Sequence, residues 1–181
     1  MIRLFVAIEL PEAVKAELAR LCGGVPGAKW VKPENLHLTM RFIGEVNEDA
    51  ANDIAAVLDQ IRAPSFNLVL SGVGQFSSHR TPRVLWVGVE KNESLVYLTG
   101  KVESALVRAG VSPDRRRFSP HITLARLRTA SKPRINSFVS TNAMFTAGPI
   151  DVDSFILFSS FLGRNGALHR PEAVYPLDAA I

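Results

Sequence analysis

Two histidines lie in the same four-residue pattern, a histidine and a threonine separated by one residue and followed by an aliphatic residue. The copies occupy residues 37–40 (HLTM) and 121–124 (HITL), which are 84 positions apart (121 − 37). Successive side chains of a strand point to opposite faces, so each copy directs its histidine and threonine to one face and its two aliphatic residues to the other. The pattern predicts two His-Thr pairs, one from each half of the chain, at a shared polar site.

Two imidazoles and two hydroxyls suit the hydrolysis of a phosphodiester. An unperturbed imidazole has a pKa of about 6.5, so near pH 7 one ring can accept a proton from water while the other donates a proton to the leaving oxygen. Each of these roles typically contributes about 10²–10⁴-fold to the rate. Threonine hydroxyls can donate hydrogen bonds to the phosphoryl oxygens. This chemistry needs no metal, so we expect neither a metal nor an organic cofactor, and residue type alone does not distinguish the acid from the base.

Three other kinds of catalytic site fit the sequence less well. Neither motif has Asp or Glu two or four residues after its histidine, and the metal-binding patterns His-Glu-x-x-His and His-x-His are absent. A single cysteine, Cys22, rules out a site with several sulfur ligands as well as an internal disulfide, and it suits the reducing cytoplasm in which we expect the protein. The chain also lacks a Gly-x-Ser-x-Gly nucleophile elbow and a glycine-rich phosphate loop.

The composition is that of a soluble globular protein, with 181 residues, 47% hydrophobic and 21% charged. No apolar run approaches the roughly 20 residues that span a membrane, so we expect no membrane partner. The net charge of +4 favours anionic partners such as RNA or phosphate. We expect a monomer with one domain over residues 1–181, made of two lobes.

Hydrophobic periodicity predicts strands and helices that mix without strict alternation, so we expect an α+β fold with largely antiparallel sheets. The expected strands are residues 2–9, 36–43, 66–70, 84–89, 121–127, 150–158 and 173–177. The expected helices cover residues 14–21, 47–61 and 95–109, and a fourth begins at Pro133. Residues 72–83 are predicted to be a loop, and residues 163–166 a turn.

Several segments, including both motifs, resemble the 2H phosphoesterase superfamily and, within it, the RNA 2′,3′-cyclic 3′-phosphodiesterase family, historically called 2′-5′ RNA ligase. The similar segments are residues 3–11 (RLFVAIELP), 35–45 (NLHLTMRFIGE), 82–86 (PRVLW) and 118–126 (FSPHITLAR), whereas residues 163–174 depart from the family pattern. The resemblance implies a bilobal fold with two pseudo-symmetric lobes of antiparallel sheet, helices packed outside, and an active-site cleft between the sheets.

The resemblance also implies an activity and a set of roles. Members of the family open a terminal 2′,3′-cyclic phosphate on RNA to a 2′-phosphate without a metal. Carried onto this chain, His37 is the proton donor to the departing ribose 3′-oxygen and His121 is the proton acceptor that activates water. Thr39 and Thr123 hold the phosphate, and so does Arg126, five residues after the second histidine.

Strand alternation conflicts with the role of Arg126. This residue should point away from His121 unless the strand ends or bulges near Ala125. Arg41 has the same parity as His37 and Thr39, which makes it a second candidate for facing the phosphate directly.

Other functions remain open at this stage. The chain can be a non-catalytic protein that binds RNA ends or nucleotides, a 2′-5′ RNA ligase, or a phosphodiesterase for small cyclic nucleotides. The basic run 115–117 is either a solvated loop or a device that attracts RNA. His79 and His169 are expected at the surface. Three aromatic residues are expected to pack in the core rather than stack on a base: Phe42, Trp86 and Phe118.

Overall fold

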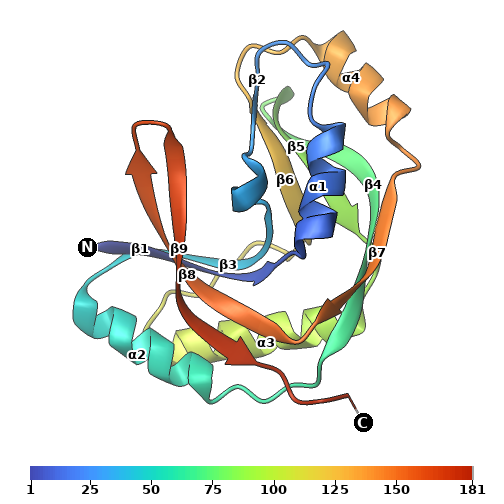
Figure 1. Cartoon of the computed structure of the whole chain (residues 1–181). Helices are drawn as coiled ribbons and strands as arrows, with labels where there is room; N and C mark the ends of the chain where they lie inside the picture. The colour runs from blue at the N-terminus through green and yellow to red at the C-terminus, as the bar shows by residue number, and fades with distance from the viewer. Residues whose placement is uncertain (181) are drawn as a thin grey trace.

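Two mainly antiparallel sheets form the framework of the protein (Figure 1), which is described here by a computed structural model for residues 1–180. The first sheet has the strand order β3-β1-β8-β9 and the second has the order β2-β6-β5-β4-β7. The strands of the first sheet are β1 (Ile2–Glu9), β3 (His37–Val46), β8 (Ser154–Gly163) and β9 (Gly166–Pro176). Those of the second are β2 (Ala28–Trp30), β4 (Phe66–Ser78), β5 (Thr81–Val89), β6 (His121–Leu127) and β7 (Thr146–Val152).

Helices cover one face of each sheet. The helices are α1 (Glu12–Leu21), α2 (Glu48–Asp59), α3 (Glu93–Arg108) and α4 (Lys132–Thr141), with a 3₁₀ turn, η1 (Pro33–Asn35), before β3. Helices α2 and α3 contact strands of the first sheet, and α1 and α4 contact strands of the second. Asn47 caps α2 as the sequence predicts, with its side-chain oxygen accepting a hydrogen bond of 2.8 Å from the backbone N–H of Ala50. The expected bilobal α+β fold with helices outside is confirmed.

The aliphatic residues of the two motifs hold their strands in the core. Leu38, Ile122 and Leu124 are each 0% exposed, and Met40 is almost as deeply buried. Because side chains alternate along a strand, the histidine and threonine of each motif lie on the opposite face, where they are partly exposed. We call this face of each sheet its histidine face, and the predicted alternation at both motifs is confirmed.

The prediction of a loop over residues 72–83 is wrong. Strand β4 continues to Ser78, and it joins β5 through a tight turn at His79 and Arg80, whose φ angles are 50° and 63°. Gly74 looked like a loop residue, but it lies opposite Trp86 in the ladder, and a Cβ at this glycine would come within 2.4 Å of the indole. The glycine is therefore a packing requirement of the sheet.

The predicted strand over residues 150–158 is two strands. It divides at Asp153, where the chain leaves β7 in the second sheet and enters β8 in the first. Hydrophobic periodicity in the sequence identifies the apolar run, but it cannot indicate that the chain passes from one sheet to the other within that run. Within residues 1–180, no helix is long and apolar enough to span a membrane.

Candidate two-histidine active site

A β-bulge in β6 decides where Arg126 points. Ala125 pairs with Leu85 and Thr123 pairs with Trp86, so Leu124 between them has no partner across the ladder. Arg126 then pairs with Val84, two residues from Trp86 and on the same face of β5. The structure therefore places Arg126 on the histidine face with Thr123, where it is exposed. The bulge near Ala125 that this orientation requires is present.

Strand β3 has a bulge at the corresponding residue. Arg41 pairs with Val6 and Thr39 pairs with Ala7, which leaves Met40 unpaired. Arg41 consequently turns to the helix-covered face, and the interpretation that it faces the phosphate is wrong. Its guanidinium donates to a carboxylate oxygen of Glu103 in α3 at 2.5 Å and to the Ser112 carbonyl at 2.6 Å.

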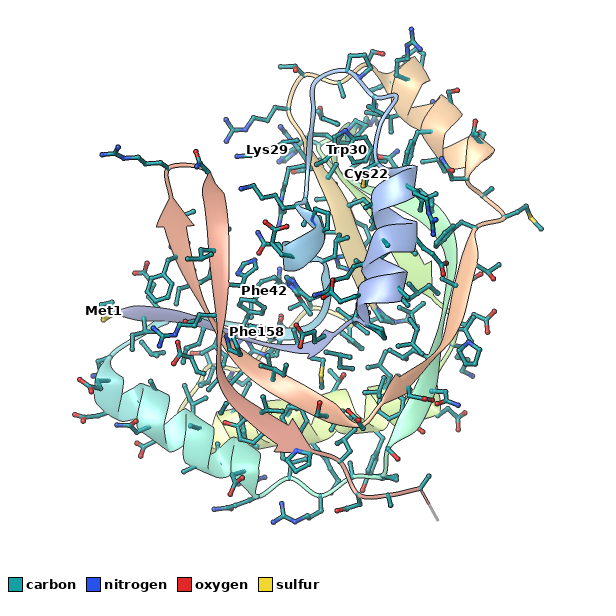
Figure 2. The ribbon with its side chains drawn as sticks, in the orientation of Figure 1. Met1, Cys22, Lys29, Trp30, Phe42 and Phe158 are labelled. Carbon is teal, nitrogen blue, oxygen red and sulfur yellow. The ribbon has the colours of Figure 1, made fainter. Side chains whose placement is uncertain are left out.

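The two bulges make Phe42 the counterpart of Arg126, at a sequence separation of 84 (126 − 42). Phe42 pairs with Phe5 and its side chain is 53% exposed, so the expectation that it packs in the core is wrong. Beneath Phe42 lies the buried ring of Phe5, with centroids 6.0 Å apart, and Phe5 in turn stacks on the buried ring of Phe158 at 5.2 Å. Phe42 and Phe158 are labelled in Figure 2. The first lobe thus offers an aromatic ring where the second lobe offers a cation.

Both imidazoles are oriented by the same backbone contact. Nδ1 of His37 lies 2.6 Å from the carbonyl oxygen of Asn35, and Nδ1 of His121 lies 2.7 Å from that of Ser119. A carbonyl oxygen can only accept, so Nδ1 carries the hydrogen and donates it in both rings. In both rings this leaves Nε2 as the nitrogen whose lone pair is free.

The surroundings of His37 are apolar and crowded. Its ring lies 5.0 Å from Phe5 and 5.3 Å from His169, the latter edge-on at 84°. Burial is the main cause that lowers the pKa of His37 to about 4, and positive charge on His169, Lys15 and His121 lowers it further, against the opposing hydrogen bond to Asn35. Strands β3 and β6, which carry the two motifs, also contact each other.

His121 has more open surroundings. The Phe76 ring meets it edge-on with centroids 4.8 Å apart, and the Trp86 ring lies 6.5 Å away. Trp86 is half-buried and lies beside a histidine. Its indole nitrogen is buried and has no hydrogen-bond partner among the described residues. The expectation of core packing is confirmed for Phe118, which packs against the main hydrophobic cluster.

Sequence reasoning missed His169. The prediction that it is a surface residue is wrong, because it lies in β9 opposite Ser160 and its ring contacts both His37 and Phe5. Only the register of the β8–β9 hairpin brings it there, and no local pattern around residue 169 encodes that register. The side-chain amide of Asn35 also donates to the Ala167 carbonyl at 2.8 Å, which ties the hairpin to the turn before His37.

The remaining charged candidates lie in a loop and in a turn between elements. All three arginines of the basic run are exposed, and Arg116 forms an ion pair of 3.1 Å with Asp114. His79 is exposed at the β4–β5 turn, as expected. In the part of the chain that the structure describes, no three His, Cys, Asp or Glu side chains come together in a group that could hold a metal ion.

Comparisons with known proteins agree with the doubled architecture. The model of the LigT-like phosphoesterase family matches twice, over residues 8–86 and 87–169, so each match contains one histidine motif. A protein of Aeropyrum pernix named RNA 2′,3′-cyclic phosphodiesterase is 38% identical over 159 residues, covering 87% of this chain and 89% of its own length. An Archaeoglobus fulgidus protein of the same name is 31% identical over 176 residues, covering 96% and 99%.

Solved structures give the same result. The crystal structure of Escherichia coli LigT complexed with 3′-AMP superimposes with a TM-score of 0.78 at 27% identity, over 97% of each chain. The family model matches nearly the whole chain. The match with the Archaeoglobus fulgidus relative covers 96% of the chain and therefore includes both histidine motifs. The chain therefore belongs to the LigT-like phosphoesterase family, within the 2H phosphoesterases.

Proposed function

We propose that this protein opens 2′,3′-cyclic phosphates at RNA ends to 2′-phosphomonoesters by general acid/base catalysis with two histidines and without a metal. The observation that carries the proposal is the matched pair of imidazoles, each held by an Nδ1–carbonyl hydrogen bond that leaves Nε2 to exchange the proton. The relatives named RNA 2′,3′-cyclic phosphodiesterase support the choice of substrate.

The proposed reaction is an attack of water on phosphorus with departure of the ribose 3′-oxygen. His121 accepts a proton from the water as its oxygen bonds to phosphorus, and His37 donates a proton to the 3′-oxygen as its bond to phosphorus breaks. The products are a 2′-phosphate and a free 3′-hydroxyl. Thr39 and Thr123 donate hydrogen bonds to the non-bridging oxygens, and the Arg126 guanidinium, which can bind two oxygens at once, neutralises their charge.

The pKa of His37 bears directly on these roles. In the free protein it is about 4, so at pH 7 the ring is neutral, whereas a proton donor must be charged. An anionic phosphodiester beside Nε2 favours the charged form and raises the pKa by about 1–3 units. His37 is thus a donor that acquires its proton together with the substrate. The reversed assignment, with His37 as acceptor, is the second candidate, and the low pKa in the free protein favours it.

An NMR titration separates the two assignments. The pKa of His37 is measured in the free protein and in the complex with a nucleoside 2′-monophosphate, the product. A pKa that rises to near 7 in the complex, so that a substantial fraction of the rings is charged at neutral pH, supports the donor role. A pKa that stays near its free value assigns the acceptor role to His37 and the donor role to His121.

Product analysis tests the function itself. The protein is incubated, with EDTA present, with an oligonucleotide that ends in a 2′,3′-cyclic phosphate, and the product is identified by chromatography against 2′- and 3′-phosphate standards. The proposal requires the 2′-phosphate. A 3′-phosphate means that the other ribose oxygen leaves, and binding without any product identifies a non-catalytic binder. A longer oligonucleotide, formed when RNA with a 5′-hydroxyl is added, identifies a ligase.

A further inference from the structure

Lys29 lies beside Arg126 on the histidine face of the second sheet. The two residues are directly opposite in the antiparallel pairing of β2 with β6. Directly opposite residues share a face, so Lys29 lies on the face to which the bulge turns Arg126. The next residue, Trp30, points to the other side of β2 (Figure 2), where its ring packs 5.5 Å from Phe138 of α4.

No acidic side chain within residues 1–180 forms an ion pair with Lys29 or Arg126. Both cationic side chains are exposed. Like charges directly opposite each other destabilise a sheet. Two uncompensated cations at this position are therefore suited to an anion that arrives from outside.

The side chains of this face form two groups, one along β6 and one in the neighbouring strand β2. His121, Thr123 and Arg126 follow one another along the histidine face of β6, and Lys29 lies one strand further out, in β2. The first three side chains are assigned above to the reacting phosphate. Lys29 extends the same positive surface beyond Arg126, toward the edge of the sheet.

The chemistry of the substrate says which anion comes next. A 2′,3′-cyclic phosphate occupies the 3′ end of an RNA chain, so the chain continues only in the 5′ direction. The nearest further anion is the phosphodiester that joins the 5′-oxygen of the terminal nucleoside to the preceding nucleotide. A cyclic mononucleotide with a free 5′-hydroxyl lacks this group.

We propose that Lys29 binds the 5′-side phosphodiester of the terminal nucleotide and so makes the protein select RNA chains over cyclic mononucleotides. The inference rests on the proposed function, because it assumes that the reacting phosphate lies at the two histidines. Lys29 is a specificity-determining residue in this account and takes no part in proton transfer.

The test compares two substrates. The kcat/KM is measured for a diadenosine dinucleotide that ends in a 2′,3′-cyclic phosphate and for adenosine 2′,3′-cyclic monophosphate, and their ratio is the selectivity. Lys29→Gln should lower this ratio roughly three- to tenfold, as expected for one exposed contact between a charge and a phosphate. Lys29→Arg should keep it. The matched control is Lys91→Gln, which removes an exposed lysine from the loop before α3 and should leave the ratio unchanged.

Salt dependence gives an independent measurement. The slope of log(kcat/KM) for the dinucleotide against log[salt] should be smaller by about 0.7 in Lys29→Gln, the value for one phosphate contact to a single strand. An unchanged ratio, or an equal loss with both substrates, overturns the inference. If the wild-type protein opens neither substrate, the proposed function fails. In that case the dissociation constants of the two uncleaved compounds are measured instead. Lys29→Gln should then lower the preference for binding the dinucleotide over the mononucleotide by the same factor, and an unchanged preference overturns the inference.

Discussion

The partial burial of His37 should make the stability of the protein depend on pH. Unfolding returns the imidazole to water, where its pKa is 6.5, from a folded state in which the pKa is about 4. Between these two values the unfolded chain binds more protons than the folded chain, so acid favours unfolding. The contribution of His37 to stability is complete above pH 6.5 and is lost as the pH falls from 6.5 to 4.

The size of this effect follows from the two pKa values. Each unit of difference corresponds to about 1.4 kcal/mol, so the whole window amounts to about 3 kcal/mol. Between pH 7 and pH 5 the folded protein should lose about 2 kcal/mol of its free energy of unfolding through His37 alone. In His37→Gln this loss disappears, because glutamine does not titrate.

Urea unfolding at pH 7 and pH 5 measures the effect. The loss of unfolding free energy between the two pH values should be about 2 kcal/mol smaller in His37→Gln than in the wild-type protein. Carboxylates contribute equally to both proteins and cancel in the comparison. His79→Gln, at the exposed β4–β5 turn, controls for the removal of a histidine and should behave as the wild type does. Equal losses in wild type and His37→Gln would refute the reasoning.

Three further predictions concern catalysis. His37→Ala and His121→Ala should each lower kcat for a cyclic-phosphate RNA end by about 10²–10⁴-fold, while circular dichroism shows a retained fold. Arg126→Gln should lower kcat/KM without changing the free energy of unfolding, whereas Arg41→Gln should cost about 1.5–3 kcal/mol of that free energy because the Glu103 carboxylate loses its buried partner. EDTA, followed by removal of released metal, should leave kcat unchanged.

Each of these predictions has a contradicting outcome. Activity within about tenfold of wild type in either histidine variant removes that ring from proton transfer. If Arg41→Gln loses activity at full stability, the orientation of the β3 bulge is misassigned. Loss of activity in EDTA that added Zn²⁺ or Mg²⁺ restores would end the metal-free mechanism.

The sequence predicts the two histidines and their threonines because these depend on local alternation along a strand. Alternation alone puts both arginines on the wrong faces, because a single unpaired residue reverses it in both motif strands, and only the family resemblance pointed to Arg126. One indication of the bulge is present in β6, where Leu124 and Ala125 are consecutive apolar residues and both are fully buried. In β3 the corresponding second residue is Arg41, whose buried position depends on a carboxylate from α3, 62 residues away along the chain.

His169 and Lys29 show a second limit. Each reaches the histidine region through strand pairing, His169 through the β8–β9 hairpin and Lys29 through the pairing of β2 with β6. Register between strands is set by turn geometry and by the packing of a whole face. The three residues of β2 carry too short a pattern to reveal a face without their partner strand.

The account depends on both imidazoles meeting the same phosphate. A crystal structure of the protein with a nucleoside 2′-monophosphate tests this directly. It should show Nε2 of His121 within about 2.6–3.2 Å of a phosphate oxygen, and Nε2 of His37 within the same range of the ribose 3′-oxygen or of a phosphate oxygen next to it, with phosphorus between the two rings. A phosphate held by one histidine alone, or bound away from both, would contradict it.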